Sequence, residues 1–323
     1  MKRIITLGVA VLVVVVLWSG AWLWAASTAT AYVKTLETAD GVKTPRVTCS
    51  TFSIGGFPFG FDVTCEGATI VSGDTTVTAA GLKASALVYR PTFVLLFGKS
   101  PVTVADAFTG SQRRLDFADA EASARLEGWR IGRVSVVMNA PVWTDTVVED
   151  RLIAKADHVE AHLVDLPDKY DAKAGLATLA EFVQVEGLDV PAQSIAAGKG
   201  SFDGEISGLP DDVRTYGDGD LLKRWAVAGG KLTLTSLKGD DSAGDRLDIT
   251  GTLSLDPQGR LGGQVRLMTK GIVERLGAAM PEQFKGLILG GQADDGSYSQ
   301  TISFAAGMVF SGLVPAGMIP PLF

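Results

Sequence analysis

The stretch RLDITGTLSLDPQGRLGGQVRLMT, residues 246–269, decides the fold class of this chain. Its two arms, Arg246–Leu255 and Gly259–Thr269, have the length and the apolar alternation of β-strands. Between them, Asp256-Pro257-Gln258-Gly259 is typical of a turn, because proline presets a turn conformation and glycine accepts a positive φ. The stretch therefore predicts two consecutive strands of an antiparallel sheet.

Strand-like segments continue on both sides of this pair. Glycine, proline and aspartate separate them, which is typical of a meander of short strands. The other predicted strands are Thr76–Ala79, Ala84–Tyr89, Val134–Met138, His158–Val164, Ala196–Gly208, Lys231–Leu237, Ser299–Phe304 and Gly307–Leu313. Proline cannot donate to a central ladder, so strand starts, edges or turns are expected at Pro58, Pro91, Pro101 and Pro141.

Four segments are predicted to be helical. Residues Asp171–Val185 place apolar side chains at helical spacing, and Asp218–Val227 reads as a short helix. Gly271–Ala279 and Pro281–Leu289 read as two more short helices. The predicted fold class is α+β, with a long, curved, mainly antiparallel sheet and a few helices packed on one of its faces.

An apolar run, Ile4–Ala26, directly follows Lys2 and Arg3. About 20 apolar residues at about 1.5 Å per residue span the ~30 Å hydrocarbon layer, so the run predicts a transmembrane helix. Basic residues stay on the cytoplasmic side, which places the rest of the chain outside the cytoplasm. The helix is expected to continue through Ala25–Glu37 and to end at Asp40-Gly41.

The competing interpretation of this run is a cleaved signal peptide, with Ala29-Thr30-Ala31 as the cleavage site. The run is longer than a signal peptide needs, and Trp18, Trp22 and Trp24 cluster where a membrane interface favours aromatic residues. The expected division is therefore an anchor at residues 1–34 and an exported domain at residues 35–323. Two halves of that domain, about 35–168 and 169–323, remain an open alternative.

The charge balance excludes one class of partner. The chain has 29 basic and 36 acidic residues, and without Lys2 and Arg3 the exported part carries 27 against 36, a net charge of −9. Such a surface does not attract nucleic acid, so no nucleic-acid partner is expected.

The chain has two cysteines, Cys49 and Cys65, and the predicted topology places both outside the cytoplasm, where disulfides persist. The simplest expectation is that they pair with each other. The residues between them, Ser50–Thr64, read as a hairpin that turns at Gly55-Gly56. A redox role is disfavoured because the spacing differs from C-x-x-C.

No motif identifies a reaction, and no cofactor or metal is predicted. His158-Val-Glu-Ala-His162 resembles a zinc-protease motif, but its glutamate is one position late. On a strand, His158, Glu160 and His162 share a face with the histidines about 13 Å apart, too far for one metal. Gly98-Lys99-Ser100 lacks the first glycine of a phosphate-binding loop. Asp240-Asp241 and Asp294-Asp295 are expected in turns, since no EF-hand spacing surrounds them.

Aromatic residues provide the one candidate site. Two sets of them are candidates for lining an apolar groove, namely Phe57, Phe59 and Phe61, and Tyr89, Phe93 and Phe97. Composition alone does not separate a groove from an ordinary hydrophobic core.

Three segments and the N-terminal anchor together resemble a known family. They are Gly56-Phe-Pro-Phe-Gly-Phe61 followed by Cys65, the turn segment Gly251–Gly263, and the Gly-x-x-Pro-x-Gly-x-Ile-Pro tail at Gly312–Pro320. The family is the DUF2125 family of bacterial membrane-anchored envelope proteins of unknown function, and the resemblance covers most of the chain. More distantly, the chain is similar to AsmA-like envelope proteins, which implies a sheet-lined groove for lipid acyl chains.

The expected function is non-enzymatic. The resemblance and the anchor imply a single-pass protein of the bacterial inner membrane, with its C-terminal domain in the periplasm. That domain is expected to bind or transfer lipid or another apolar ligand in a sheet-lined groove. The alternatives are a scaffold or adaptor for an envelope protein complex, and an envelope hydrolase with an unrecognised site.

Overall fold

The computed structural model describes residues 2–271 and 290–323. These residues form two compact units, which are described separately. Unit 1 comprises Met1–Ala122 and Trp143–Arg151, and unit 2 comprises Ser123–Val142 and Leu152–Phe323. The units therefore do not coincide with the halves considered on either side of residue 168.

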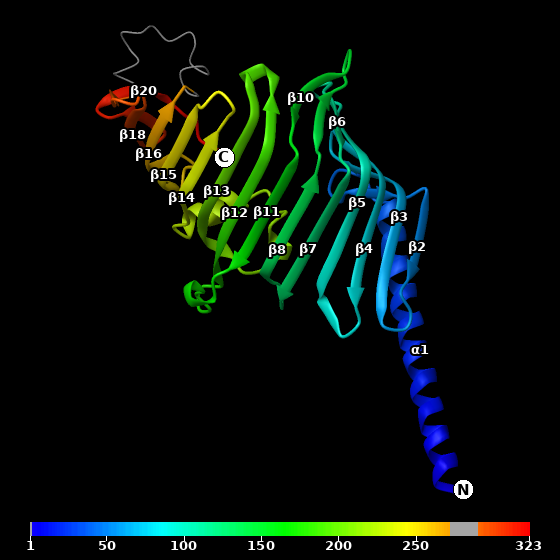
Figure 1. Cartoon of the computed structure of the whole chain (residues 1–323). Coiled ribbons are helices and arrows are strands. Elements are labelled where there is room, and N and C mark those ends of the chain that lie inside the picture. The colour runs from blue at the N-terminus through cyan, green and yellow to red at the C-terminus, as the bar shows by residue number, and fades with distance from the viewer. Residues whose placement is uncertain (1, 272–289) are drawn as a thin grey trace. The chain divides into compact units, whose positions relative to one another are not determined.

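Unit 1 consists of a long helix and an antiparallel sheet (Figure 1). Strands β1 and β2 both pair with β3, and the sheet continues through β4, β5 and β6. The strand β7 (Asp119–Glu127) begins in unit 1 and ends in unit 2. The other elements are α1 (Lys2–Glu37), β1 (Arg46–Thr48), β2 (Thr51–Gly55), β3 (Gly60–Ser72), β4 (Thr75–Leu87), β5 (Arg90–Asp106), β6 (Gln112–Asp116) and β9 (Val142–Asp145).

Unit 2 is a meander in which β8 pairs with β11 and the sheet then runs through β12, β13, β14, β15, β16, β18, β19 and β20. All of these pairings are antiparallel. The strands are β8 (Arg130–Asn139), β10 (Arg151–Lys155), β11 (His158–Asp165), β12 (Leu176–Val190), β13 (Ile195–Pro210), β14 (Lys231–Asp240), β15 (Arg246–Leu255), β16 (Leu261–Lys270), β17 (Gly291–Gln292), β18 (Tyr298–Ala305), β19 (Met308–Ser311) and β20 (Val314–Met318). The helical elements are η1 (Pro167–Lys169), η2 (Pro191–Gln193), η3 (Val213–Thr215) and α2 (Leu221–Val227).

The predicted fold class is confirmed: a long apolar helix precedes a large antiparallel sheet. The stretch 246–269 forms β15 and β16, which pair from Leu255↔Leu261 to Arg246↔Lys270. Asp256 closes the turn between them, because its carboxylate accepts hydrogen bonds from the backbone N–H groups of Gln258 and Arg260, each at 2.9 Å. The short helix expected near Asp218–Val227 is α2. The two helices expected around residues 272–289 lie outside the described residues.

The helix predicted at Asp171–Val185 is wrong. Its residues from Leu176 onward belong to β12, which pairs with β11 on one side and β13 on the other. The run Leu176–Val183 is apolar at nearly every position, so its period does not distinguish a helix from a strand. Backbone pairing to two neighbouring strands decides the conformation, and this information is tertiary.

One expectation about the prolines is also wrong. Pro101 lies inside β5, a strand paired on both sides. It is tolerated there because the register between β4 and β5 shifts next to it, between the pairs Gly81↔Lys99 and Ala79↔Val102. A register shift takes residues out of the regular ladder, and a residue that lacks an N–H is tolerated at such a position.

The predicted disulfide is confirmed. Cys49 and Cys65 are bonded across 16 residues, with their Cα atoms 5.3 Å apart, and β2 and the start of β3 form the hairpin between them. Cys65 packs with Ala68 and Ala79 in a small buried cluster, against which Cys49 and Val102 also lie. The bond thus joins the first strands after α1 to the core of unit 1.

The predicted extension of the N-terminal helix is confirmed as well, because α1 runs without interruption to Glu37. The helix is long and apolar enough to span a membrane, which is consistent with a single-pass anchor.

Candidate functional site

The sheet of unit 2 has one face made almost entirely of apolar side chains. In an antiparallel sheet, residues paired across strands point to the same face. Each set of residues paired across successive strands therefore forms one row of side chains on one face. The central row runs from β8 through β11 to β16 and reads Val136, Ala161, Val183, Phe202, Leu237, Ile249 and Leu267. A flanking row reads Val134, Leu163, Glu181, Gly204, Leu234, Gly251 and Val265. We call the face that carries these two rows the apolar face.

The row between those two points to the opposite face and is more polar. It reads Ser135, His162, Phe182, Asp203 and Ser236. The next row on that face includes Glu160, Gln184, Ser201, Lys238 and Asp248. The sequence therefore separates the two faces chemically, as expected for a sheet with one face in water.

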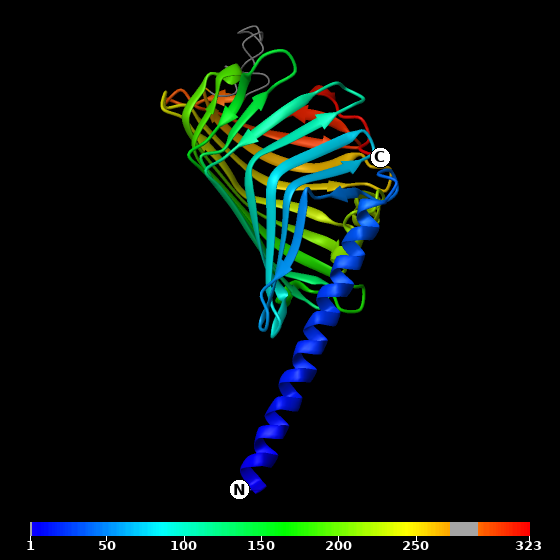
Figure 2. The same cartoon turned by 90° about the vertical axis from the view of Figure 1, so that its right-hand side faces the viewer.

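The apolar face of unit 2 is not fully covered by the described residues. Every side chain of its central row is at least partly exposed, and Val136 is 40 % exposed. Figure 2 shows the strands of this unit as a single layer. The short helix α2 packs at one end of that layer, where the indole N–H of Trp225 donates to the carbonyl of Ser207 at 2.8 Å. Gly230 makes this contact feasible, because a Cβ there would lie 2.1 Å from the Trp225 indole nitrogen.

One charged side chain, Glu181 of β12, interrupts the apolar face. It pairs with Leu163 on one side and Gly204 on the other. Burial raises the pKa of the Glu181 carboxyl above its ordinary value of 4.5. The signal for this residue is present in the sequence as a lone carboxylate within an apolar run, but the incorrect helix prediction concealed its place on the sheet.

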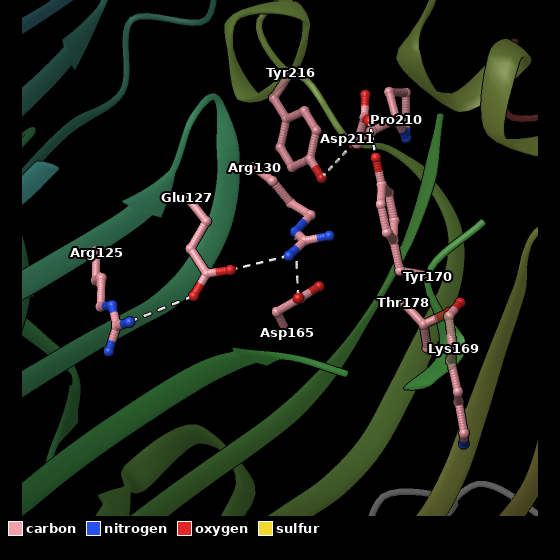
Figure 3. Close-up of polar contacts among 10 residues, drawn as sticks. All are labelled: Arg125, Glu127, Arg130, Asp165, Lys169, Tyr170, Thr178, Pro210, Asp211 and Tyr216. Atoms are coloured by element: carbon pink, nitrogen blue, oxygen red, sulfur yellow. Dashed lines mark hydrogen bonds and ion pairs between the residues drawn. The ribbon is translucent and has the colours of Figure 1, made fainter. Parts of the chain in front are cut away.

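The apolar face ends in a group of polar side chains that we call the polar cluster, defined by Glu127, Arg130, Asp165, Tyr170 and Asp211 (Figure 3). Antiparallel topology brings these residues together, since β8 begins where β11 ends and β13 ends beside the start of β12. The loops after β11 and β13 then bring Tyr170 and Asp211 to the same end of the sheet.

Arg130 is the centre of the polar cluster. Its Nε lies 3.3 Å from Asp165 Oδ2, and its Nη2 lies 3.0 Å from Glu127 Oε2. The guanidinium carbon lies 4.2 Å from the centre of the Tyr170 ring, a cation–π distance. The Tyr170 hydroxyl donates to Asp211 Oδ2 at 2.8 Å. These contacts of Arg130 and Tyr170 connect the turn before β8 with the loop after β11 and the loop after β13.

Asp165 is the most buried member of the polar cluster. Its side chain is only 4 % exposed, and its oxygens accept no hydrogen bond from the described residues. Burial raises the pKa of the Asp165 carboxyl above its ordinary value, and the nearby Arg130 charge opposes that rise only in part. Losing the Arg130 partner would leave a buried carboxylate uncompensated, which is costly.

Next to the polar cluster lies an open cavity of about 380 Å³, lined by Glu127, Trp129, Arg130, Tyr170, Asp211 and Asp212. The Arg214 guanidinium covers the Trp129 ring at 4.4 Å and forms an ion pair with Asp212 at 2.6 Å. The hydrogen bond to Asp211 raises the pKa of the Tyr170 phenol, and burial adds to this rise. The cavity thus offers carboxylate and guanidinium groups for hydrogen bonding at the end of an apolar surface. None of these residues was singled out in the sequence, because loops distant along the chain bring them together.

The histidines lie elsewhere. As expected for a strand, His158, Glu160 and His162 share one face of β11, and this is the more polar face. Glu160 Oε2 lies 3.5 Å from His162 Nε2 and 3.8 Å from His158 Nε2. The His158 ring also hydrogen-bonds the side chain of Asn139 at 2.6 Å. Within the described residues, no group of three histidine, cysteine or acidic side chains is arranged to hold a metal ion.

The remaining candidate motifs are structural. Lys99 lies within β5 and forms an ion pair with Glu66 at 2.5 Å, so Gly98–Ser100 is part of a strand. Asp241 and Asp295 organise turns, since each accepts a backbone N–H two residues further along the chain. The turn expected at Asp294-Asp295 is present, whereas of the other pair only Asp241 lies beyond the strand, because Asp240 is the last residue of β14.

The six aromatic candidates all belong to unit 1. Phe61 is paired with Ala86 of β4 and stacks on Trp22 of α1, with ring centres 5.3 Å apart. Phe57 and Phe59 lie in the turn between β2 and β3, and Tyr89 in the turn between β4 and β5; the exposed fractions of these three side chains are 53 %, 64 % and 69 %. Phe97, with Phe93 four residues earlier on β5, is paired with Lys83. Their role in lining a groove stays a prediction.

Unit 1 has an apolar sheet face of its own. One of its rows reads Ile54, Val63, Ala84 and Leu96 across β2–β5, and the next reads Phe52, Cys65, Leu82 and Gly98. Leu82 and Leu96 are 37 % and 43 % exposed, so the described residues leave this face partly open too.

Comparison with known proteins assigns a family. No curated protein and no solved structure matches the chain, so the more distant similarity to AsmA-like proteins has no support from them. A family model described as "Uncharacterized protein conserved in bacteria (DUF2125)" matches residues 22–320, from the second half of α1 to the C-terminal tail. The resemblance carried by the Phe-Pro-Phe turn, the Asp256–Gly259 turn and the proline-rich tail is confirmed, and the chain belongs to the DUF2125 family.

Proposed function

We propose that this protein is a non-enzymatic, membrane-anchored protein that holds lipid acyl chains on the apolar face of unit 2. The proposal rests on the central row of that face, which is apolar at every position from Val136 on β8 across the strands to Leu267 on β16. All of its side chains are partly exposed. A soluble domain normally buries such a row under a second layer, because each half-exposed apolar side chain forfeits transfer free energy. An acyl chain lying across the strands would restore that burial.

The polar cluster supports an amphiphilic rather than a purely apolar ligand. It lies at the end of the same sheet, and its cavity presents the charged groups of Glu127, Arg130 and Asp211. A lipid with its acyl chain on the apolar face would have its polar part within reach of these groups. Ligand sites commonly combine a largely apolar lining with a few placed polar groups in this way.

The N-terminal helix supports two further parts of the proposal, namely that the ligand comes from a membrane and that the protein acts in the periplasm. A helix that spans a membrane keeps the protein at a lipid surface. Lys2 and Arg3 before the helix favour a cytoplasmic N-terminus, and this supports a location of α1 in the bacterial inner membrane and of both units in the periplasm.

The proposal is tested with the purified full-length protein in detergent micelles and a phospholipid that carries a photoreactive diazirine on its acyl chain. We expect crosslinks to peptides of β12–β15. Leu237→Glu places a charge in the centre of the apolar face, so it should abolish most of the crosslinking.

The matched control is Ser236→Glu, one position earlier on β14. Ser236 is paired with Asp203 on the opposite face, and Leu237 with Phe202 on the apolar face. The control should crosslink as the wild type does, and circular dichroism should show both variants folded. Equal yields for the two variants would contradict the proposal.

A further inference from the structure

From Trp18 onward, α1 is packed against a hairpin of unit 1, whereas the turns of the helix before Trp18 are exposed. The indole N–H of Trp18 donates to the carbonyl of Pro58, and that of Trp22 to the carbonyl of Gly60, each at 2.9 Å. The Trp22 ring also packs edge-on against Phe57, with ring centres 5.5 Å apart. Trp22 and Ala26 are each only 9 % exposed, whereas the apolar side chains Ile4–Leu17 project from the unit with exposures around half or more. The turn between β2 and β3 is therefore held at a defined height along the helix.

That height falls within the membrane span. From Arg3, the basic residue at the cytoplasmic boundary, Trp18 is 15 residues further and Trp22 is 19. At about 1.5 Å per residue, these positions lie about 22 Å and about 28 Å along the helix. The hydrocarbon layer is ~30 Å thick, and a tilt of the helix would only increase the depth of both positions. Pro58 is thus at the depth of the outer leaflet, and Gly60 is near its boundary with water.

The turn has the chemistry that this depth requires. Residues Thr51–Phe61 carry no charge, and Phe57 and Phe59 are 53 % and 64 % exposed. Hydrocarbon penalises a backbone carbonyl that lacks a donor. Four carbonyls of this turn have one within the protein: Gly56 accepts from the N–H of Gly60, Phe59 from the N–H of Val88, and Pro58 and Gly60 from the two indoles.

The neighbouring turn, between β4 and β5, has the chemistry of the membrane interface. The N–H of Val88 joins it to Phe59 at 3.0 Å. Figures 1 and 2 show that both turns point along α1 toward its N-terminal half. Tyr89 is 69 % exposed, and Arg90 follows it. Tyrosine rings favour the headgroup level, and an arginine there reaches lipid phosphates.

We infer that the turn Gly56–Gly60 inserts into the outer leaflet of the bilayer that α1 spans, with Tyr89 and Arg90 at its headgroups. The partner is the lipid surface itself. The helix and the turn then form one membrane-embedded wedge, which fixes the height and the tilt of unit 1 above the bilayer. Cleavage at Ala31 would remove Trp18 and Trp22 from this packing, so the same contacts favour a retained anchor.

The test measures the depth of single positions in the full-length protein. Three variants, Phe59→Cys, Val11→Cys and Asp74→Cys, are labelled with the environment-sensitive fluorophore NBD without reductant, because Cys49 and Cys65 are bonded to each other. Each is reconstituted into vesicles of phosphatidylcholine and phosphatidylglycerol, with and without lipids that carry a nitroxide on the acyl chain. Asp74 is the matched control, since it lies in the exposed turn at the other end of β3, about 40 Å from the Phe59 turn at about 3.4 Å per residue.

We expect the probe at position 59 to emit at shorter wavelength than the probe at position 74 and to lose intensity with nitroxide lipids. The probe at position 11 should respond strongly, and the probe at position 74 should not respond. If positions 59 and 74 behave alike while position 11 is quenched, the helix is inserted and the wedge is disproved. If position 11 is not quenched either, the span itself is absent and the inference fails with it. The lipid-binding proposal rests on the other unit and is judged separately by the Leu237 and Ser236 variants.

Discussion

Glu181 shows how one residue reports on its surroundings. Its carboxylate lies between Leu163 and Gly204 on the apolar face, and burial raises its pKa above 4.5. Between pH 4.5 and the raised value, the native state binds more protons than the unfolded state. Wild-type stability therefore falls as the pH rises through this window, by linkage.

The variant Glu181→Gln removes that titration. We expect it to be more stable than the wild type at pH 7 and to lose this advantage as the pH falls to 4. Thermal unfolding of both proteins across this range is the measurement. The matched variant Asp203→Asn removes an exposed carboxylate from the more polar face of the neighbouring strand β13 and should not reproduce the effect. A pH-independent difference between Glu181→Gln and the wild type would contradict the assignment.

Single residues divide clearly into those that the sequence reveals and those that it does not. The partners Cys49 and Cys65 follow from their number and compartment alone, and the bond is present. Arg130 and Asp165 are 35 residues apart in sequence and look like ordinary surface charges until β8 and β11 pair. Ion pairs between distant residues depend on strand register, which no local pattern encodes.

Among the elements, the hairpin that follows α1 depends most on a covalent bond. The Cys49–Cys65 bond closes a loop of 16 residues, and β1 and β2, on either side of Cys49, make most of their contacts with β3. Closing such a loop stabilises a chain by about 3 kcal/mol, chiefly by restricting the unfolded state.

Replacing both cysteines with alanine should therefore lower the free energy of unfolding of unit 1 by about 3 kcal/mol. Urea unfolding of the full-length protein in micelles, followed by tryptophan fluorescence, measures this loss. The wild type with reductant is the control and should approach the variant. If reductant leaves the wild-type unfolding midpoint unchanged, the bond does not stabilise the hairpin.

Elements in which apolar and polar residues alternate regularly were predictable from the sequence. Elements whose apolar residues fit both a helix and a strand were not. β15 and β16 alternate regularly and carry a strong turn between them, so their pairing was visible in the sequence. β12 is apolar on both faces near its start, because Phe182 and Ala180 pack on one side while Leu179 and Val183 lie on the other. Only its two neighbouring strands specify that it is extended.

At the scale of the molecule, the expectation still to be tested is the side of the membrane on which the two units lie. Leu313 is 98 % exposed, and both native cysteines are in the disulfide. A Leu313→Cys variant thus carries a single reactive thiol. We expect a membrane-impermeant maleimide to label it in spheroplasts without detergent, because the domain is expected outside the cytoplasm. Labelling that requires detergent would reverse the proposed orientation.

The sequence by itself determined the long apolar N-terminal helix, the disulfide, the antiparallel strand class and the family. These features depend on composition, on residue spacing, or on periods read over a few neighbouring residues. Tertiary structure alone decided that β12 is a strand, that Glu181 faces apolar neighbours, that the polar cluster assembles around Arg130, and that Trp18 and Trp22 hold the Phe-Pro-Phe turn beside α1. Each of these depends on which segments meet across long loops, and that choice minimises the free energy of the whole chain rather than of any segment.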